Sequence, residues 1–376
     1  QGQRMDDEEL PPNNLVFLLD VSGSMSSYNK LPLLKESFGL LVDKLRPEDR
    51  VAIVVYAGAA GLVLESTPGN KKSEILTSIN RLSSGGSTAG GAGIELAYKV
   101  AEENIIKKGN NRVILATDGD FNVGQSSDGS MKRLIEEKRE TGVFLTCLGF
   151  GYGNYKDSKL ETLADAGNGN YAYIDNLDEA KKVLVTQMGG TLFTIAKDVK
   201  IQLEFNPATV ETYRLVGYEN RLLENEDFDD DTKDAGEIGA GHSVTAIYEV
   251  TFKNGRQSEP DIDDLRYNAN ENPNLYPNEL LTVKFRYKKP DGKKSRLIQQ
   301  PVYKKVMDEE NLSNNFLFSA AVAEFGMLLR DSKYKKNASF KHVLKLAKRS
   351  IGSDKNGYRK DFISMIESAE GLYASN

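Results

Sequence analysis

The sequence predicts an α/β fold with a doubly wound, mostly parallel sheet, followed by an antiparallel, sandwich-like β region and C-terminal helices. Two changes of hydrophobic pattern and the chain length predict this. Short apolar runs alternate with amphipathic segments up to about residue 190, then the apolar period becomes two, and from Asn314 it becomes helical. A chain of 376 residues also exceeds the usual size of one hydrophobic core. We therefore expect an N-terminal tail at 1–11, a first domain at 12–190, and a C-terminal domain at 191–376 with antiparallel β at 191–310 and helices at 311–376.

The strands expected in the first domain are nearly continuous apolar runs, a pattern typical of strands buried on both faces of a parallel sheet. They lie at 15–20, 50–57, 112–118, 142–150 and 171–175. The segment 61–66 follows a Gly-rich turn and is expected to be an antiparallel edge strand. Helices on both faces, entered by right-handed crossovers, are predicted by apolar residues at helical spacing between the strands. These residues are Leu34, Phe38, Leu41, Val42, Leu45, Ile94, Ala97, Val100, Ala101, Leu134 and Ile135.

Strict alternation in the second region predicts half-buried antiparallel strands at 199–205, 244–252 and 281–287. The long polar segments 223–241 and 255–279 are expected to be connections. At the C-terminal end the spacing predicts two or three amphipathic helices. Their expected apolar faces consist of Phe318, Val322, Phe325, Leu329, Val343, Leu344, Ala347, Ile351, Phe362, Met365, Ile366 and Leu372.

Composition excludes several classes of function. The net charge of -6 comes from 49 basic and 55 acidic residues that are interspersed, so we expect no nucleic-acid surface. One cysteine, Cys147, excludes internal disulfides and thiolate metal clusters, and two histidines leave little material for imidazole sites. The longest uncharged run, 51–64, is too short to span a membrane. Because the chain begins with Gln1 and has no signal-peptide pattern, we expect a mature or truncated product whose targeting segment has been removed.

The sequence "DVSGSM" at 20–25 follows directly from the first expected strand. Asp20, Ser22 and Ser24 alternate, so their oxygens can face one small volume if the backbone stays extended, and Gly23 allows a close turn. Thr88, in a Gly-rich loop, and Asp118, at another strand end, are expected at the same crevice. Hydroxyl and carboxylate oxygens are hard ligands that suit Mg²⁺, Mn²⁺ or Ca²⁺.

This combination resembles the von Willebrand factor type A (vWA) domain with its metal-ion-dependent adhesion site. Asp20, Ser22 and Ser24 match the D-x-S-x-S element, Thr88 the separate threonine, and Asp118 the separate aspartate in "TDG". The resemblance implies a Rossmann-like fold and a metal site. In it the serines and the threonine ligate directly or nearly so, while the aspartates act directly or through water.

Beyond the site, "NRVILATDGDFNVG", "GGTLFTIAKDVKIQLEFNP", "DAGEIGAGHSVTA" and "AAVAEFGMLLRDS" are similar to the bacterial YfbK-type family. Its members carry a vWA domain followed by a family-specific C-terminal region. The resemblance covers nearly the whole chain, apart from an N-terminal region that such proteins usually carry before the vWA domain. It implies a bacterial cell-envelope protein, periplasmic or surface-exposed, often a lipoprotein anchored through a segment absent here.

We expect a metal-dependent protein-binding module and no enzyme: two carboxylates balance a divalent ion, and an open position favours an Asp or Glu carboxylate of a protein partner. The alternatives are a structural envelope protein with a vestigial or stabilising metal site and, less favoured, a metal-dependent hydrolase or phosphotransferase. For the latter, the position two residues after Asp20 holds Ser22, where an aspartyl-phosphate enzyme needs a second carboxylate. The oligomeric state and the role of the C-terminal domain are left open.

Two local alternatives remain at this point. Ser22 and Ser24 could cap the following helix, with Asp118 and Asp120 in an Asx-turn. A second candidate cation site is an acidic cluster that lacks the glycine and glutamate of an EF-hand in register, so a solvated connection is the favoured interpretation. The cluster consists of Glu224, Glu226, Asp227, Asp229, Asp230 and Asp231.

Overall fold

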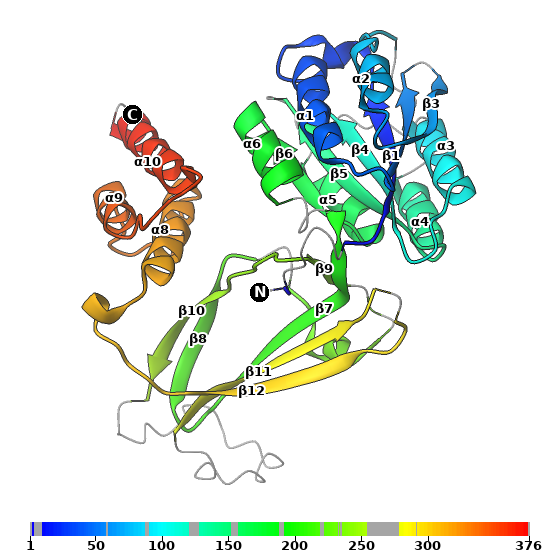
Figure 1. Ribbon diagram of the computed structural model, residues 1–376. Helices are drawn as coiled ribbons and strands as arrows, with labels where there is room; N and C mark the ends of the chain where they lie inside the picture. The colour runs from blue at the N-terminus through cyan, green and yellow to red at the C-terminus, as the bar shows by residue number, and fades with distance from the viewer. Residues whose placement is uncertain are drawn as a thin grey trace. The chain divides into compact units, whose positions relative to one another are not determined.

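A computed structural model of the chain describes most of its length (Figure 1). The described residues are 2–3, 10–57, 59–86, 90–119, 128–151, 157–187, 192–218, 222–231, 233, 235–253, 278–290 and 292–374. The chain divides into two compact units, which are described separately. The first unit comprises Gln1–Lys200, Glu226–Ser243 and Phe285–Leu297, and the second comprises Ile201–Asn225, Val244–Lys284 and Ile298–Asn376.

A six-stranded sheet forms the centre of the first unit, in the order β3-β2-β1-β4-β5-β6. Its strands are β1 (Asn13–Asp20), β2 (Arg50–Tyr56), β3 (Ala60–Pro68), β4 (Asn110–Thr117), β5 (Val143–Phe150) and β6 (Tyr171–Ile174). Every neighbouring pair is parallel except β2 with β3, which is antiparallel. Strand order reverses between β1 and β4, so the sheet is doubly wound, which confirms the predicted fold class.

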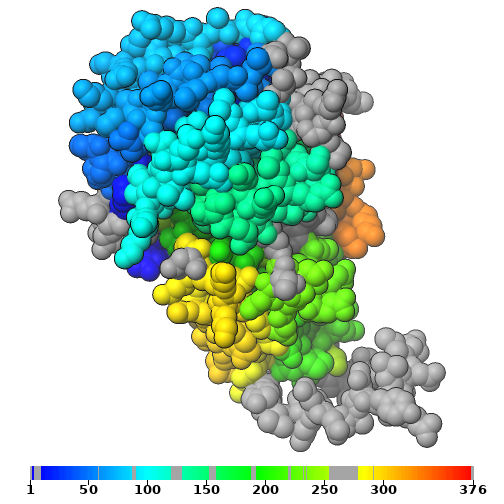
Figure 2. All heavy atoms as spheres, turned by 90° about the vertical axis from the view of Figure 1, so that its right-hand side faces the viewer, coloured from blue at the N-terminus to red at the C-terminus, as the bar shows by residue number. Residues whose placement is uncertain are grey.

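Strand β1 separates two apolar cores because its side chains alternate between the faces of the sheet. Phe17 and Leu19 face one core, where Phe17 meets the ring of Phe38 edge to face at 4.5 Å, and Val16 and Leu18 face the other. The first core is covered by α1 (Leu31–Lys44), α2 (Lys72–Asn80), α6 (Leu177–Lys181) and the π-helical turn η2 (Lys182–Thr186). The second is covered by α3 (Gly90–Glu103), α4 (Asp128–Arg139) and α5 (Asp157–Ala166). Figure 2 views the molecule from the side of α3 and α4.

Three of these helices, α1, α3 and α4, contain the apolar residues that predicted them, except Leu45, which is the C-cap of α1. Helices α2, α5 and α6 were not predicted. The apolar contributions of α2 and α6 are short: α2 places only Ile75 and Ile79 in the core, and α6 only Ala180. Two or fewer apolar positions do not establish a helical period, which explains why the pattern missed these two helices. Helix α5 does carry helical spacing, which was overlooked; its core residues are Leu160, Leu163, Ala164 and Ala166.

The chain beyond residue 192 forms antiparallel strands, as the period of two predicted. The strands are β7 (Thr194–Phe205), β8 (Val210–Val216), β9 (Gly236–Gly239), β10 (Ile247–Phe252), β11 (Glu279–Lys288) and β12 (Arg296–Tyr303). They form a sheet of order β12-β11-β7-β9 and a two-stranded sheet of β10 and β8. Strand β9 lies inside 223–241, so interpreting that whole segment as a connection was wrong. The other expected connection, 255–279, lies outside the described residues except for its last two.

Three helices end the described chain: α8 (Asn314–Leu329), α9 (Phe340–Arg349) and α10 (Tyr358–Ala374). The hydroxyls of Ser313 and Ser339 accept hydrogen bonds at the N-termini of α8 and α9. The expected face of α8 was partly wrong: Leu317, Ala321, Phe325 and Leu328 are buried, whereas Val322 and Leu329 are 44% and 46% exposed. Likewise Met365 and Leu372 of α10 are exposed. Among the described residues, no helix combines the length and the apolar character needed to cross a membrane.

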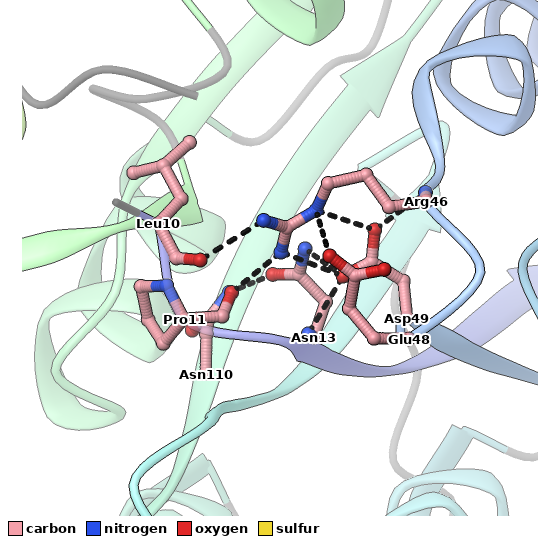
Figure 3. A network of polar contacts seen from close by, with 7 residues as sticks. All are labelled: Leu10, Pro11, Asn13, Arg46, Glu48, Asp49 and Asn110. Carbon is pink, nitrogen blue, oxygen red and sulfur yellow. Dashed lines mark hydrogen bonds and ion pairs between the residues drawn. The ribbon is translucent and has the colours of Figure 1, made fainter. Parts of the chain in front are cut away.

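A polar network joins the start of β1 to the loop between α1 and β2 (Figure 3). The buried Asp49 carboxylate accepts hydrogen bonds from the backbone and side-chain nitrogens of Asn13 at 2.9 and 2.8 Å. It also accepts one from the Arg46 backbone at 2.7 Å and pairs with the Arg46 guanidinium at 3.1 Å. The same guanidinium donates to the carbonyl oxygens of Leu10 and Pro11 at 2.9 and 2.8 Å. One carboxylate and its arginine partner therefore join two segments, 10–13 and 46–49, at the end of the sheet opposite Asp20.

Asp49→Ala tests this network. We expect the free energy of unfolding to fall by roughly 3 kcal/mol, because the change leaves a partly buried guanidinium and two Asn13 donors without their acceptor. The matched control is Glu48→Gln, since Glu48 also pairs with Arg46, at 3.4 Å, but its side chain is 52% exposed. The control should change stability by less than about 0.5 kcal/mol. Urea denaturation measures both, and equal losses for the two variants would contradict the assignment.

Candidate metal site

The candidate site begins where β1 ends. Asp20 and Ser22 are buried and Ser24 is exposed, and the hydroxyl oxygens of the two serines lie 3.0 Å apart. Contrary to the expectation from the sequence, the backbone does not stay extended as far as Ser24. Ser22 is extended at φ -63 and ψ 165, and the chain then enters the 3-10 turn η1 (Gly23–Ser26). The turn itself brings the hydroxyls together. The capping interpretation was wrong, because the Ser22 side chain makes no capping bond to η1 and Lys30 occupies the N-cap of α1.

Hydrogen bonds from its own loop and from both neighbouring strands hold the Asp20 carboxylate. The Ser22 backbone N–H donates to Oδ1 at 2.9 Å, and the hydroxyls of Tyr56 and Thr117 donate to Oδ2 at 3.1 and 3.0 Å. Tyr56 and Thr117 end β2 and β4, the two strands that flank β1, and in the register Tyr56 lies opposite Asp20. Helix α3 packs directly on this tyrosine because Gly93 has no Cβ, which would lie 2.9 Å from the Tyr56 Cβ.

Sequence reasoning missed Tyr56 and Thr117. The available signal was their position as the last residues of two apolar strands, because the carboxyl ends of parallel strands lie at the same edge of the sheet as the end of β1. Strand order, which the sequence does not contain, was needed to use that signal.

Asp118 follows β4 and is buried next to the same loop. Its Oδ2 lies 2.8 Å from the Lys30 ammonium nitrogen, which also donates to the Ser24 carbonyl oxygen at 3.0 Å. Burial raises the pKa of Asp20 above its usual value, hydrogen bonds from Ser22 and Thr117 lower it, and the charge of Asp118 raises it. The pKa of Tyr56 is raised well above normal by burial and then by the Asp20 charge. The two carboxylates therefore share one electrostatic environment.

Thr88 lies outside the described residues, as does Asp120. The loop that carries Thr88 is described up to Gly86, and it is joined to the loop after β1 by two backbone bonds. The Gly23 N–H donates to the Gly86 oxygen at 3.1 Å, and the Gly85 N–H donates to the Val21 oxygen at 2.8 Å. The structure thus brings four of the five predicted residues, all except Thr88, to one cluster of loops. Gly86, two residues before Thr88, is hydrogen-bonded to that cluster.

The chemistry of these donors fits a hard divalent cation. The described site residues offer two carboxylates and two hydroxyls, and carboxylate and hydroxyl oxygens are ligands for Mg²⁺, Mn²⁺ or Ca²⁺. Clusters of three or more His, Cys, Asp or Glu residues that could hold a metal do not occur in the described part of the chain. A cation site here therefore depends on serine hydroxyls.

The acidic cluster at 224–231 is organised by cations of the chain itself. The buried Lys200 ammonium donates to the backbone oxygens of Asp227, at 2.9 Å, and Asp230. The buried Lys288 donates to the Asp231 oxygen at 2.7 Å and pairs with Asp198 at 2.8 Å. Most of the acidic side chains are exposed, in agreement with the solvated interpretation. The carbonyl oxygens that a calcium loop would direct at its ion face lysines here.

Tyr56→Phe tests the hold on Asp20. Removing the hydroxyl takes one donor from a buried carboxylate, so we expect the free energy of unfolding to fall by about 1–2 kcal/mol. Tyr98→Phe is the matched control, because Tyr98 is equally buried and its hydroxyl has no hydrogen-bond partner among the described residues. The control should be neutral or slightly stabilising. Thermal unfolding followed by circular dichroism decides, and a neutral Tyr56→Phe would show that the Tyr56 bond carries no net stability.

Comparison with known proteins places both regions of the chain. The family model "von Willebrand factor type A domain" matches residues 14–186, and the model "Uncharacterized protein YfbK, C-terminal" matches residues 190–372. "Uncharacterized protein YfbK" of Escherichia coli (strain K12) is 47% identical over 368 residues, which is 97% of this chain and 63% of that protein. The chain thus spans less than two thirds of the length of that relative.

Two further similarities have lower sequence identity. Human inter-alpha-trypsin inhibitor heavy chain H4 is 31% identical over 151 residues, which is 38% of this chain and 16% of that protein. Among solved structures, von Willebrand factor type A from Catenulispora acidiphila is 17% identical with a TM-score of 0.48, covering 95% of this chain and 82% of that chain. The chain belongs to the YfbK-type family, in which a vWA domain is followed by a YfbK-type C-terminal domain.

Proposed function

We propose that the chain is a divalent-metal-dependent protein-binding module. The observation that carries this proposal is the meeting of two serine hydroxyls and two buried carboxylates at the point where strand order reverses, the usual place of ligand sites in such sheets. The proposed ligand set, in which an aspartate can act through water, is Asp20, Ser22, Ser24, Thr88 and Asp118. The proposed ion is Mg²⁺, with Mn²⁺ or Ca²⁺ as alternatives of the same ligand preference.

The chain's own charges support a site that recognises acidic groups. Asp20 and Asp118 together balance a divalent cation, while the hydroxyls add no charge. When bound, the ion supplies an electrophilic position for an anionic oxygen from outside. Ser24 is exposed whereas Asp20 and Ser22 are buried, so the space between these residues is accessible to solvent at Ser24. We propose an Asp or Glu carboxylate of a protein partner as the group that is bound there.

A binding role is also favoured over a serine-based hydrolase. Such an enzyme needs a base beside its nucleophile, and imidazole is the commonest one. Within the described residues, no imidazole is hydrogen-bonded to Ser22 or Ser24; the two hydroxyls are bonded to each other. We propose 12–190 as the extent of the metal-binding domain and 191–376 as the C-terminal domain. Location in the bacterial cell envelope stays a prediction from the family resemblance.

Titration with a divalent cation tests the proposal. Because an ion that binds only the folded state stabilises it, a hundredfold excess over Kd should add ~2.7 kcal/mol of stability and raise the Tm by several degrees. Asp118→Asn should abolish this rise, since it removes one of the two balancing charges. The matched control is Asp43→Asn, an exposed aspartate on α1, which should respond to the ion as the wild type does.

Differential scanning calorimetry in Mg²⁺, Mn²⁺ and Ca²⁺ measures these shifts. A wild-type Tm that none of the three ions changes at millimolar concentration would contradict the proposal. So would an Asp118→Asn variant that keeps the full rise.

A further inference from the structure

The Lys30 side chain lies inside the candidate metal site. Its ammonium nitrogen is 2.8 Å from Asp118 Oδ2, and the two side chains are 18% and 3% exposed. The same nitrogen donates to the Ser24 carbonyl oxygen at 3.0 Å. The Lys30 ammonium group therefore contacts two of the five proposed site residues, Ser24 and Asp118, and the lysine side chain is only partly exposed to water.

The position of this lysine is fixed by the fold. The Lys30 backbone N–H donates to the Ser27 oxygen at 3.0 Å, and its own oxygen accepts from the Leu34 N–H at 2.7 Å, which anchors Lys30 at the start of α1. Gly151 follows β5, and a Cβ there would lie 2.8 Å from both Cγ and Cε of Lys30. Gly151 also has φ +96, which favours glycine. The methylene groups of Lys30 therefore occupy space that a side chain at position 151 would fill.

The charge balance gives this lysine a role. A divalent ion in the proposed site draws on the Asp118 carboxylate, and the ammonium group already pairs with that carboxylate. Two cations a few ångströms apart in a partly buried site repel each other more strongly than they would in water. Binding of the ion must therefore displace the ammonium group from Asp118 or work against its charge.

We propose that Lys30 is a tethered cation that competes with the divalent ion for Asp118, so that the site exchanges between a lysine-paired and a metal-bound state. This inference rests on the proposed function, because it concerns regulation of the same site. Lysine pairing weakens ion binding, and it stabilises the protein when no ion is present. The same contact with the Ser24 oxygen links the exchange to the loop that carries the serine ligands.

Isothermal titration calorimetry with Mn²⁺ on the full chain tests the inference. Lys30→Met keeps the apolar stem and removes the charge, so the Kd for Mn²⁺ should fall roughly tenfold or more. Lys30→Arg keeps the charge and should leave the Kd near the wild-type value. The matched control is Lys99→Met on α3, whose side chain is 71% exposed and whose partner Glu103 lies 3.9 Å away, and its Kd should not change.

The Tm without metal is the second measurement. It should fall in Lys30→Met, because Asp118 loses its ammonium contact, and saturating Mn²⁺ should restore most of the loss. Lys30→Gln, which keeps a hydrogen-bond donor, should also bind Mn²⁺ more tightly, and it replaces Lys30→Met if that variant does not fold.

The outcomes separate the two proposals. If the wild type binds Mn²⁺ and the neutral Lys30 variants bind it equally or more weakly, the lysine inference is wrong and the metal site stands. If neither the wild type nor any Lys30 variant binds the ion, both are wrong. If Lys30→Met binds Mn²⁺ and the wild type does not, the lysine excludes the ion completely. This result supports the lysine inference and contradicts the proposed metal-dependent function of the wild type under those conditions.

Discussion

The buried Asp20 carboxylate is the constraint on which the rest of the site depends. A carboxylate removed from water is costly unless donors or a cation surround it, and here the donors come from β1's own continuation and from both neighbouring strands. Tyr56 and Thr117 reach it only because β2 and β4 run parallel to β1 and end at the same level. The doubly wound topology, which places β1 and β4 side by side, is therefore a requirement of the site as much as of the fold.

Electrostatics connects this carboxylate to the rest of the site. Burial raises the pKa of Asp20, and the nearby charge of Asp118 acts in the same direction. Two such groups favour a cation beside them. The chain supplies one in Lys30, and the proposed function supplies a second, stronger one in a divalent ion. The serine hydroxyls carry no charge, so they repel neither the lysine ammonium group nor a divalent ion. Either the Lys30 ammonium group or a divalent ion can therefore neutralise the carboxylates of this site.

Much of this was predictable from the sequence. The strands β1, β2, β4 and β5 are nearly continuous apolar runs, the pattern typical of strands buried on both faces of a parallel sheet, and Asp20 and Asp118 lie at the ends of two of them. Cross-strand partners were not predictable, because Tyr56 looks like any aromatic end of a strand until the strand order is known. Lys30 was missed for a related reason. The ammonium group of a lysine lies several ångströms from its own backbone, so the position of the residue in the sequence does not show which groups it contacts. The buried face of α8 was misjudged because that helix is apolar nearly all round, so its spacing favours no single face.

The most direct test of the account is the position of an ion in a crystal of the full chain grown with Mn²⁺ and measured at the manganese absorption edge. We predict one anomalous peak bounded by the Ser22 and Ser24 hydroxyls, near the Asp118 carboxylate, with the Lys30 ammonium moved away from Asp118. An ordered loop after β1 with no peak beside these hydroxyls, at an ion concentration that yields peaks elsewhere on the chain, would contradict it.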